Sequence, residues 1–169
     1  MTHEEFEEAS NYWQMKDATG KKPSHEALLS IMEEYIHANN TCALATGYGT
    51  FVRCTPIEYS YYDGAFWMFS EGGLKFFALE KNKNVCLSIY DPYDGFNKLN
   101  GMQITGIAEI VEPYCQEYLR AAAFKNLPLE ALNKLSSPMY LIKIEPKHID
   151  FLHAAFREQG FFARQALDF

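Results

Sequence analysis

The hydrophobic pattern of the chain changes its period near residue 40, and this change constrains the fold more than any other feature. Before it, residues 4–16 and 27–38 carry apolar side chains at helical spacing, and the second segment follows Ser24, a good N-cap. After it, apolar and polar residues alternate with the period of a β-strand. We therefore expect two N-terminal helices followed by a sheet.

The rest of the chain reads as short strands joined by tight turns. Asp63-Gly64 is a strong tight-turn signal. The expected strands cover residues 41–46, 51–62, 65–69, 85–90, 102–111, 140–144 and 149–152, and the helices between them cover 74–83, 113–125 and 127–135. Many short strands with few helices are typical of an antiparallel barrel with peripheral helices. Parallel α/β architecture is disfavoured.

At 169 residues the chain fits a single domain. We expect N-terminal helices over residues 1–40, a barrel with inserted helices over 41–153, and a C-terminal tail over 154–169. Aromatic residues make up 15% of the chain, more than a small core needs, so some should line a pocket or an interface.

The charge pattern excludes some partners. The formal net charge is -7 and no basic cluster is present, which argues against nucleic acid as a partner. No apolar run approaches the roughly 18 to 20 residues that span a bilayer, and the opening segment is acidic, unlike a secretory signal. We therefore expect a cytoplasmic protein with no membrane partner.

Cysteine and histidine give no sign of a metal site. Cys42, Cys54, Cys86 and Cys115 are scattered without a CxxC pair, which predicts four reduced and mostly buried thiols. Of the five histidines only His148 and His153 are close in sequence, and such a pair is more often ordinary than metal-binding. The motifs GxGxxG, GxxxxGK[ST], HExxH and GxSxG are all missing. No metal and no catalytic residue is assigned.

Polar residues on or beside the expected strands are the best candidates for a site. Arg53 and Thr55 are two apart and share one face of their strand, and Gln103 and Thr105 do the same on theirs, so two polar faces could meet at one site.

The segment from Ser70 to Lys75 adds a hydroxyl, two glycines and a lysine, which together can enclose a phosphate. The alternatives are a solvated turn with Lys75 in water, and a surface ion pair at Arg53.

In their order, these residues resemble a known family. The stretch that carries the resemblance reads FVRCTPIEYSYYDGAFWMFSEGGLKFFALEKNKNVCLSI and then GMQITGIAEIVEP. It is similar to the pyridoxamine 5'-phosphate oxidase-related FMN-binding split-barrel family over residues 24–152. The chain lacks that oxidase's consecutive Arg-Lys pair and has Gly73-Leu74-Lys75 there, and it also lacks the Arg-rich C-terminal motif. The resemblance therefore does not imply vitamin B6 oxidation.

The resemblance implies an antiparallel, Greek-key-like split β-barrel that works as a homodimer, with FMN at the subunit interface and a small-molecule substrate. Arg53 and Lys75 would neutralise the phosphate, Ser70 would donate to it, and Gln103 would reach the cofactor across the dimer. The full set of implied FMN contacts is Arg53, Cys54, Thr55, Pro56, Met68, Phe69, Ser70, Lys75 and Gln103.

The implied activity is that of an oxidoreductase. Two other functions stay open: a non-enzymatic flavin-binding protein, and a heme-binding or heme-degrading split barrel in which His148 or His153 ligates iron.

The C-terminal segment supplies a separate hypothesis. Phe161, Phe162 and Arg164 follow a possible hinge at Gly160, so we expect them to fold over the flavin and to bind substrate. The alternative is a frayed or merely packed chain end.

Overall fold

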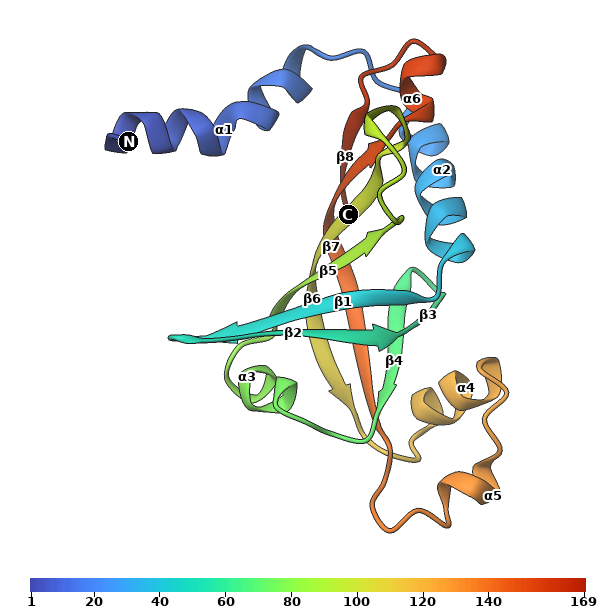
Figure 1. Ribbon diagram of the computed structural model, residues 1–169. Helices are drawn as coiled ribbons and strands as arrows, with labels where there is room; N and C mark the ends of the chain where they lie inside the picture. The colour runs from blue at the N-terminus through green and yellow to red at the C-terminus, as the bar shows by residue number, and fades with distance from the viewer.

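The computed structural model describes the backbone of residues 1–169 and every side chain except those of Asp17 and Phe96. One antiparallel sheet of eight strands dominates it, with helices around its edges (Figure 1). The strands are β1 (Thr41–Tyr48), β2 (Phe51–Glu58), β3 (Ser60–Tyr62), β4 (Ala65–Ser70), β5 (Asn84–Tyr90), β6 (Asn100–Val111), β7 (Tyr140–His153) and β8 (Arg164–Asp168). The helices are α1 (His3–Thr19), α2 (His25–Ala38), α3 (Lys75–Lys81), the 3-10 turn η1 (Phe96–Lys98), α4 (Gln116–Phe124), α5 (Leu129–Leu132) and α6 (Ala155–Glu158).

The sheet follows the order β2-β1-β5-β6-β7-β4-β3, and β8 pairs with β7 as well. Strand β7 pairs with β6 along most of its length, with β4 over residues 140–144 and with β8 over residues 148–152. The sheet curls until β2 contacts β4, which produces the curled half-barrel visible in Figure 1. The expected mainly β, antiparallel fold with peripheral helices is confirmed.

The strand period separates the two faces of this sheet. The inner face packs against α2 through Leu28, Met32 and Ile36, and these residues belong to the main core. A second cluster, which includes Trp67 and Tyr118, joins α4 and α5 to the other end of the sheet. Each fully buried side chain of this size contributes about 1.5–3 kcal/mol by leaving water.

The helix expected over residues 127–135 is only the short α5, and three other differences from the sequence expectations affect the strands and the chain end. The expected strand over residues 51–62 is broken at Tyr59, whose N–H and hydroxyl donate to carbonyl oxygens of Asn40 and Ile36. The two expected strands over residues 140–144 and 149–152 are the single strand β7, because the bulge opposite Gly106 lets pairing continue past Pro146. The expected tail over residues 154–169 contains α6 and β8.

Helix α1 projects away from the sheet (Figure 1). A capping box between Thr2 and Glu5 starts it, and near its other end the Trp13 ring lies 6.3 Å from the Phe162 ring and 5.1 Å from the Arg164 guanidinium. The amide of Phe162 also donates to the Lys21 carbonyl oxygen in the linker. Phe162 and Arg164 therefore hold the C-terminal end of this helix, and its N-terminal end projects.

Across the described residues, every helix is too short or too polar to cross a membrane.

The bulge between β6 and β7 generates a prediction about stability. A Cβ atom on Gly106 would lie 2.7 Å from the Glu145 carbonyl oxygen and 2.8 Å from the Ile144 Cγ2 atom, so Gly106→Ala must force two paired strands apart. We expect it to lower the free energy of unfolding by about 1–3 kcal/mol, as overpacking does. Urea denaturation followed by circular dichroism measures the change.

Gly101→Ala on the same strand is the matched control. The nearest atom to its new Cβ is Tyr90 Cβ at 3.7 Å, an ordinary contact. Its unfolding free energy should stay near that of the unmodified protein, and equal losses in both variants would contradict the role given to the bulge.

Candidate functional site

A buried lysine marks the first part of the site. Lys75 begins α3 yet only 6% of it is exposed, and its ammonium donates to the carbonyl oxygen of Gly72. The Ser70 hydroxyl donates to the same carbonyl oxygen at 3.1 Å and accepts from the Gly72 amide at 3.2 Å. Gly72 and Gly73 have φ angles of 133° and 103°, a backbone that favours glycine, so both glycines are needed for this turn.

The charge on Lys75 has no counter-charge in the described part of the chain. No described carboxylate lies within ion-pair distance of either Lys75 or Arg53. Burial alone lowers the pKa of Lys75, because desolvation disfavours the ammonium. A buried cation without a partner is costly for a fold, so this position favours an anion.

Arg53 lies on the inner face of β2, opposite Thr46 in the β1–β2 ladder. Thr46 is 3% exposed and its hydroxyl has no hydrogen-bond partner in the described structure. On β4, Ser70 shares the inner face with Met68. Because β2 contacts β4, the expected phosphate-binding residues Arg53, Ser70 and Lys75 belong to neighbouring elements at one end of the barrel.

The other expected FMN contacts are divided between the faces. Thr55 shares the inner face of β2 with Arg53, whereas Cys54 and Pro56 point outward. The side chain of Met68 is fully buried in the main core and the Phe69 ring packs at 5.3 Å from Tyr118, so a cofactor could approach these two residues only at their backbone. Thr55 therefore joins Arg53, Ser70 and Lys75 on the inner side of the barrel. The side chains of Cys54, Pro56, Met68 and Phe69 do not face this group.

Gln103 lies on the outer face of the sheet, because its neighbours Met102 and Ile104 point into the core. Within one chain Gln103 and Arg53 are therefore on opposite sides of the sheet, and the two polar faces proposed from strand spacing do not meet.

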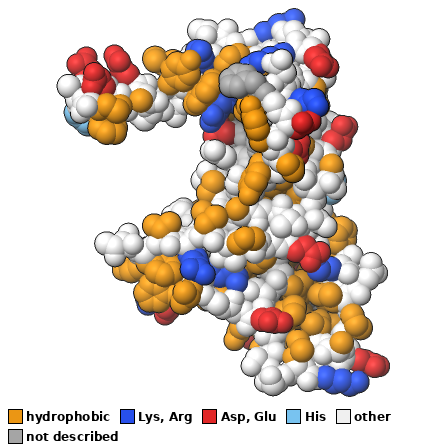
Figure 2. All heavy atoms as spheres, in the orientation of Figure 1, with side chains coloured by type: hydrophobic (Ala, Val, Ile, Leu, Met, Phe, Trp, Pro, Cys, Tyr) orange, Lys and Arg blue, Asp and Glu red, His pale blue; other side chains and the backbone are white. Residues whose placement is uncertain are grey.

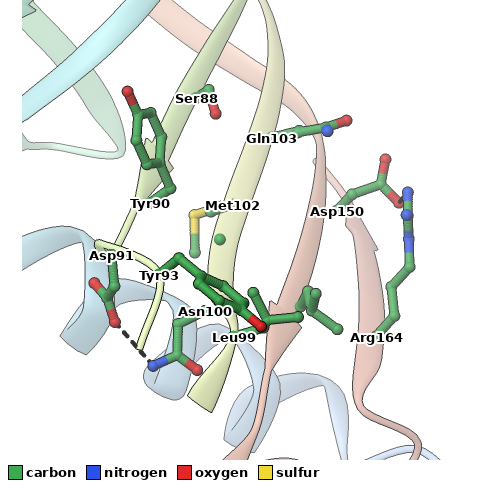
Figure 3. Close-up of a pocket in the computed structure, with 12 residues that line it drawn as sticks. Ser88, Tyr90, Asp91, Tyr93, Leu99, Asn100, Met102, Gln103, Asp150 and Arg164 are labelled. Carbon is green, nitrogen blue, oxygen red and sulfur yellow. Dashed lines mark hydrogen bonds and ion pairs between the residues drawn. The ribbon is translucent and has the colours of Figure 1, made fainter. Parts of the chain in front are cut away.

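The outer face carries a pocket at Gln103 (Figure 3). Its volume is about 370 Å³ and strands β5 to β8 and the 91–99 segment supply its walls. Figure 3 shows Tyr90 and Tyr93 on one side and Asp150 and Arg164 on the other. The lining residues are Ser88, Tyr90, Asp91, Tyr93, Leu99, Asn100, Gly101, Met102, Gln103, Asp150, Leu152 and Arg164.

A line of charged side chains borders this pocket. Asp150 Oδ1 lies 3.0 Å from Arg164 Nη2, and Asp150 Oδ2 lies 3.5 Å from His148 Nε2. On the other side of the imidazole, His148 Nδ1 lies 2.6 Å from Asp168 Oδ1. We name Asp168, His148, Asp150 and Arg164 the charge line.

Sequence reasoning missed most of this pocket. Asp150 and His148 come from one strand, and Asp168 and Arg164 from another that was expected to be a tail. The available signal was the spacing of two between His148 and Asp150, which puts both on one face of a strand. Pairing with β8 could not be anticipated because it depends on long-range contacts.

Of the three expected substrate-binding residues, only Arg164 lines the pocket. Phe161 packs against the main core, and Phe162 packs against Trp13 and Gly20. The residues from Arg164 onward pair with β7 as part of the sheet. The two phenylalanines therefore anchor the chain end, and nothing in this arrangement resembles a free flap over the pocket.

The four cysteines are free, as expected, but the expectation that most of them are buried is wrong: Cys42 is buried, Cys86 and Cys115 are half-buried, and Cys54 is exposed. Burial raises the pKa of Cys42 to about 12, so this thiol stays protonated. Among the described residues no group of three or more His, Cys, Asp or Glu side chains is arranged to hold a metal ion.

The two histidines proposed as iron ligands contact different groups. Both ring nitrogens of His148 face carboxylates. The His153 ring packs 5.0 Å from the Phe151 ring and 5.6 Å from the Phe156 ring, and burial lowers its pKa although the carboxylate of Asp91 acts against this.

No family model and no curated protein matches the sequence. The fold, however, matches solved structures. A FAD-binding protein from Mesorhizobium loti is 16% identical with a TM-score of 0.60, over 83% of this chain and 94% of that one. The heme storage protein HutZ from Vibrio cholerae is 14% identical with a TM-score of 0.60, over 80% and 93%.

A pyridoxamine 5'-phosphate oxidase-like protein from Listeria innocua is 20% identical with a TM-score of 0.57, over 74% of this chain and 98% of that one. At these identities the likeness concerns the fold alone, which in this chain is an antiparallel half-barrel with flanking helices. The chain therefore shares its split-barrel fold with these three proteins.

Proposed function

We propose that this protein binds FMN and acts as an FMN-dependent oxidoreductase on a small molecule. The observation that carries the proposal is the buried ammonium of Lys75, which has no described carboxylate partner. A phosphate would supply the missing negative charge, and charge-assisted hydrogen bonds to it are among the strongest in proteins.

The neighbouring polar groups suit the same role. Arg53 brings a second cation without a described ion-pair partner, and Thr46, opposite it in the ladder, brings a buried hydroxyl without a hydrogen-bond partner. Ser70 holds the turn whose carbonyl oxygen now accepts from Lys75. On binding, Lys75 would exchange this neutral acceptor for a phosphate oxygen.

FMN supplies two-electron redox chemistry when bound. The backbone at Cys54 to Pro56 and at Met68 to Phe69 would lie against the ring. Gln103 would meet the polar edge of the ring from a second copy of the chain, since it is on the opposite face of the sheet from Arg53 within one copy. Arg164, in the same pocket as Gln103, would bind the substrate.

The homodimer that this arrangement needs is supported by the surface. Helix α1 and the β1–β2 hairpin with α3 form two projections, and hydrophobic side chains gather on both (Figure 2). Phe6 on α1 is 59% exposed and Val52 on the hairpin is 77% exposed. Apolar groups of this size on two projections are typical of a surface that another chain covers.

The dimer predicts a mass in solution. Light scattering should report twice the chain mass for the purified protein. Val52→Glu places a charge on the outer face of β2 and should shift the mass toward that of a monomer. Leu135→Glu, at a 46% exposed position beyond α5, is the control and should remain dimeric. A monomer that binds FMN tightly would contradict the shared site.

The phosphate assignment predicts a difference between two flavins. Lys75→Met and Arg53→Ala should each weaken FMN binding by about 1.5–3 kcal/mol, or roughly 10- to 150-fold, because each removes a hydrogen bond to a charged group. Riboflavin, which lacks the phosphate, should bind all variants within about twofold. Quenching of flavin fluorescence measures both affinities.

Lys83→Ala is the matched control, because Lys83 is an exposed lysine just beyond α3. It should bind FMN as the unmodified protein does. Lys75→Met should not lower the unfolding free energy of the flavin-free protein, since it removes an unpaired buried charge. Equal weakening of FMN and riboflavin would mean that Lys75 does not contact phosphate.

Two measurements separate the proposed function from its alternatives. The visible spectrum of the purified protein should show the two bands of an oxidised flavin, whereas an intense Soret band would establish heme instead. Steady-state oxidation of NADH or NADPH by the FMN-loaded protein should then exceed that of free FMN. A flavin spectrum without turnover of either reductant would favour a protein that stores or senses FMN.

A further inference from the structure

The carboxylate of Asp150 lies between the guanidinium of Arg164 and the imidazole of His148. One of its oxygens is 3.0 Å from the Arg164 guanidinium and the other is 3.5 Å from the His148 imidazole. The Nε atom of Arg164 is buried and has no hydrogen-bond partner in the described structure. Arg164 therefore has donor capacity that Asp150 does not use.

The net charge of the charge line depends on whether the imidazole of His148 is protonated. With a neutral imidazole, Arg164 is the one cation of the charge line and Asp150 needs it. With a protonated imidazole, His148 lies between Asp168 and Asp150 and can neutralise either of them. Arg164 is then available to a second anion. Imidazole changes charge between about pH 5 and pH 8, so this exchange falls within the physiological range.

We propose that the pocket at Gln103 and Arg164 binds a small aromatic carboxylate, and that binding is coupled to the uptake of one proton by His148. As a description of the substrate of an FMN enzyme, this inference rests on the proposed function. The carboxylate takes the Arg164 guanidinium, Asp150 turns its charge to the protonated His148, and Asp168 holds the far side of the imidazole.

The pocket suits an aromatic ligand. Tyr90 and Tyr93 lie across it from Arg164 (Figure 3), and these two residues are 65% and 73% exposed. A planar ring between them and the guanidinium would cover apolar surface that is now in water. Gln103 and Ser88 add neutral hydrogen-bonding groups to the wall.

The charged groups that face His148 come from three segments of the chain. Asp150 faces it from its own strand, and Asp168 and Arg164 face it from β8. Across the hollow that His148 shares with α1, Lys22 supplies a positive charge, and the described α1 residues Ser10, Trp13 and Gln14 are neutral. The charged groups that face His148 are therefore Asp150, Asp168, Arg164 and Lys22.

Benzoate is a suitable probe, because its charge is constant across the range in which imidazole titrates. Calorimetric titration of the FMN-loaded protein should give the strongest binding near pH 5.5 and weaker binding as the pH rises to about 8, across the range in which imidazole loses its charge. Titrations in buffers with different ionisation enthalpies should show uptake of up to about one proton per benzoate. Benzamide, which carries no charge, should show neither effect.

Variants of the charge line should separate its members. Asp150→Asn removes the competitor for Arg164, so benzoate should bind tightly at every pH. His148→Gln removes the alternative partner of Asp150, so benzoate should bind weakly at every pH. Arg164→Gln should abolish binding. Lys147→Gln, which removes an exposed charge beside His148 on β7, is the control and should keep the pH dependence.

The result that overturns the proposal is benzoate binding that is absent or independent of pH in the unmodified protein, or weaker binding to Asp150→Asn. Near-ultraviolet circular dichroism checks that each variant is folded. The flavin spectrum tests the proposed function, and benzoate binding tests this inference. Binding of benzoate that depends on pH in a protein that holds no flavin would contradict the proposed function alone. Flavin binding without the benzoate effect would contradict this inference alone.

Discussion

The two-residue period of the β6–β7 ladder is the constraint on which the rest of the molecule depends. It sends Met102, Ile104 and Phe151 into the core and leaves Gln103 and Asp150 on the outer face. A slip of one residue would bury the charged groups, so packing of the inner face fixes where the outer pocket lies. The bulge at Gly106 adjusts the register without changing which face is buried.

The same separation gives the two proposed sites different electrostatics. Lys75 lies in a poorly solvated position, where a single unpaired charge is costly and a bound anion gains most. The charge line is partly exposed, its members are already paired, and water screens them. Tight binding of a cofactor phosphate suits the first environment, and exchange of a substrate anion against a carboxylate suits the second.

Local patterns predicted most of the elements. The Ser24 cap, the helical spacing before Asn39 and the Asp63-Gly64 turn are all interactions between residues close in sequence, and all are found. The break at Tyr59 could not be predicted because it depends on hydrogen bonds to Asn40 and Ile36. Likewise β8 is a strand because it pairs with β7. The composition of its five residues alone does not predict a strand.

The candidate site was predictable to a similar degree. The grouping of Ser70 with Lys75 follows from a short turn, whereas the charge line requires the β7–β8 register. The sequence could also pair polar residues by strand face, but it could not tell which face was the inner one. For that reason it placed Arg53 and Gln103 at one site, although within one chain they lie on opposite faces of the sheet and on strands that β1 and β5 separate.

That separation has a consequence for how the proposed enzyme is assembled. A single FMN can touch Arg53 and Gln103 together only if the two residues come from different copies of the chain. Cofactor binding and dimer formation are then thermodynamically linked, because each contributes contacts that the other needs. The pocket that holds Arg164 lies on the same outer face as Gln103, so in the proposed dimer the copy that completes the flavin site would also bring Arg164 to the substrate. The residues proposed to bind the phosphate in one copy and the residues proposed to bind the substrate in the other would thus come together only in the assembled dimer.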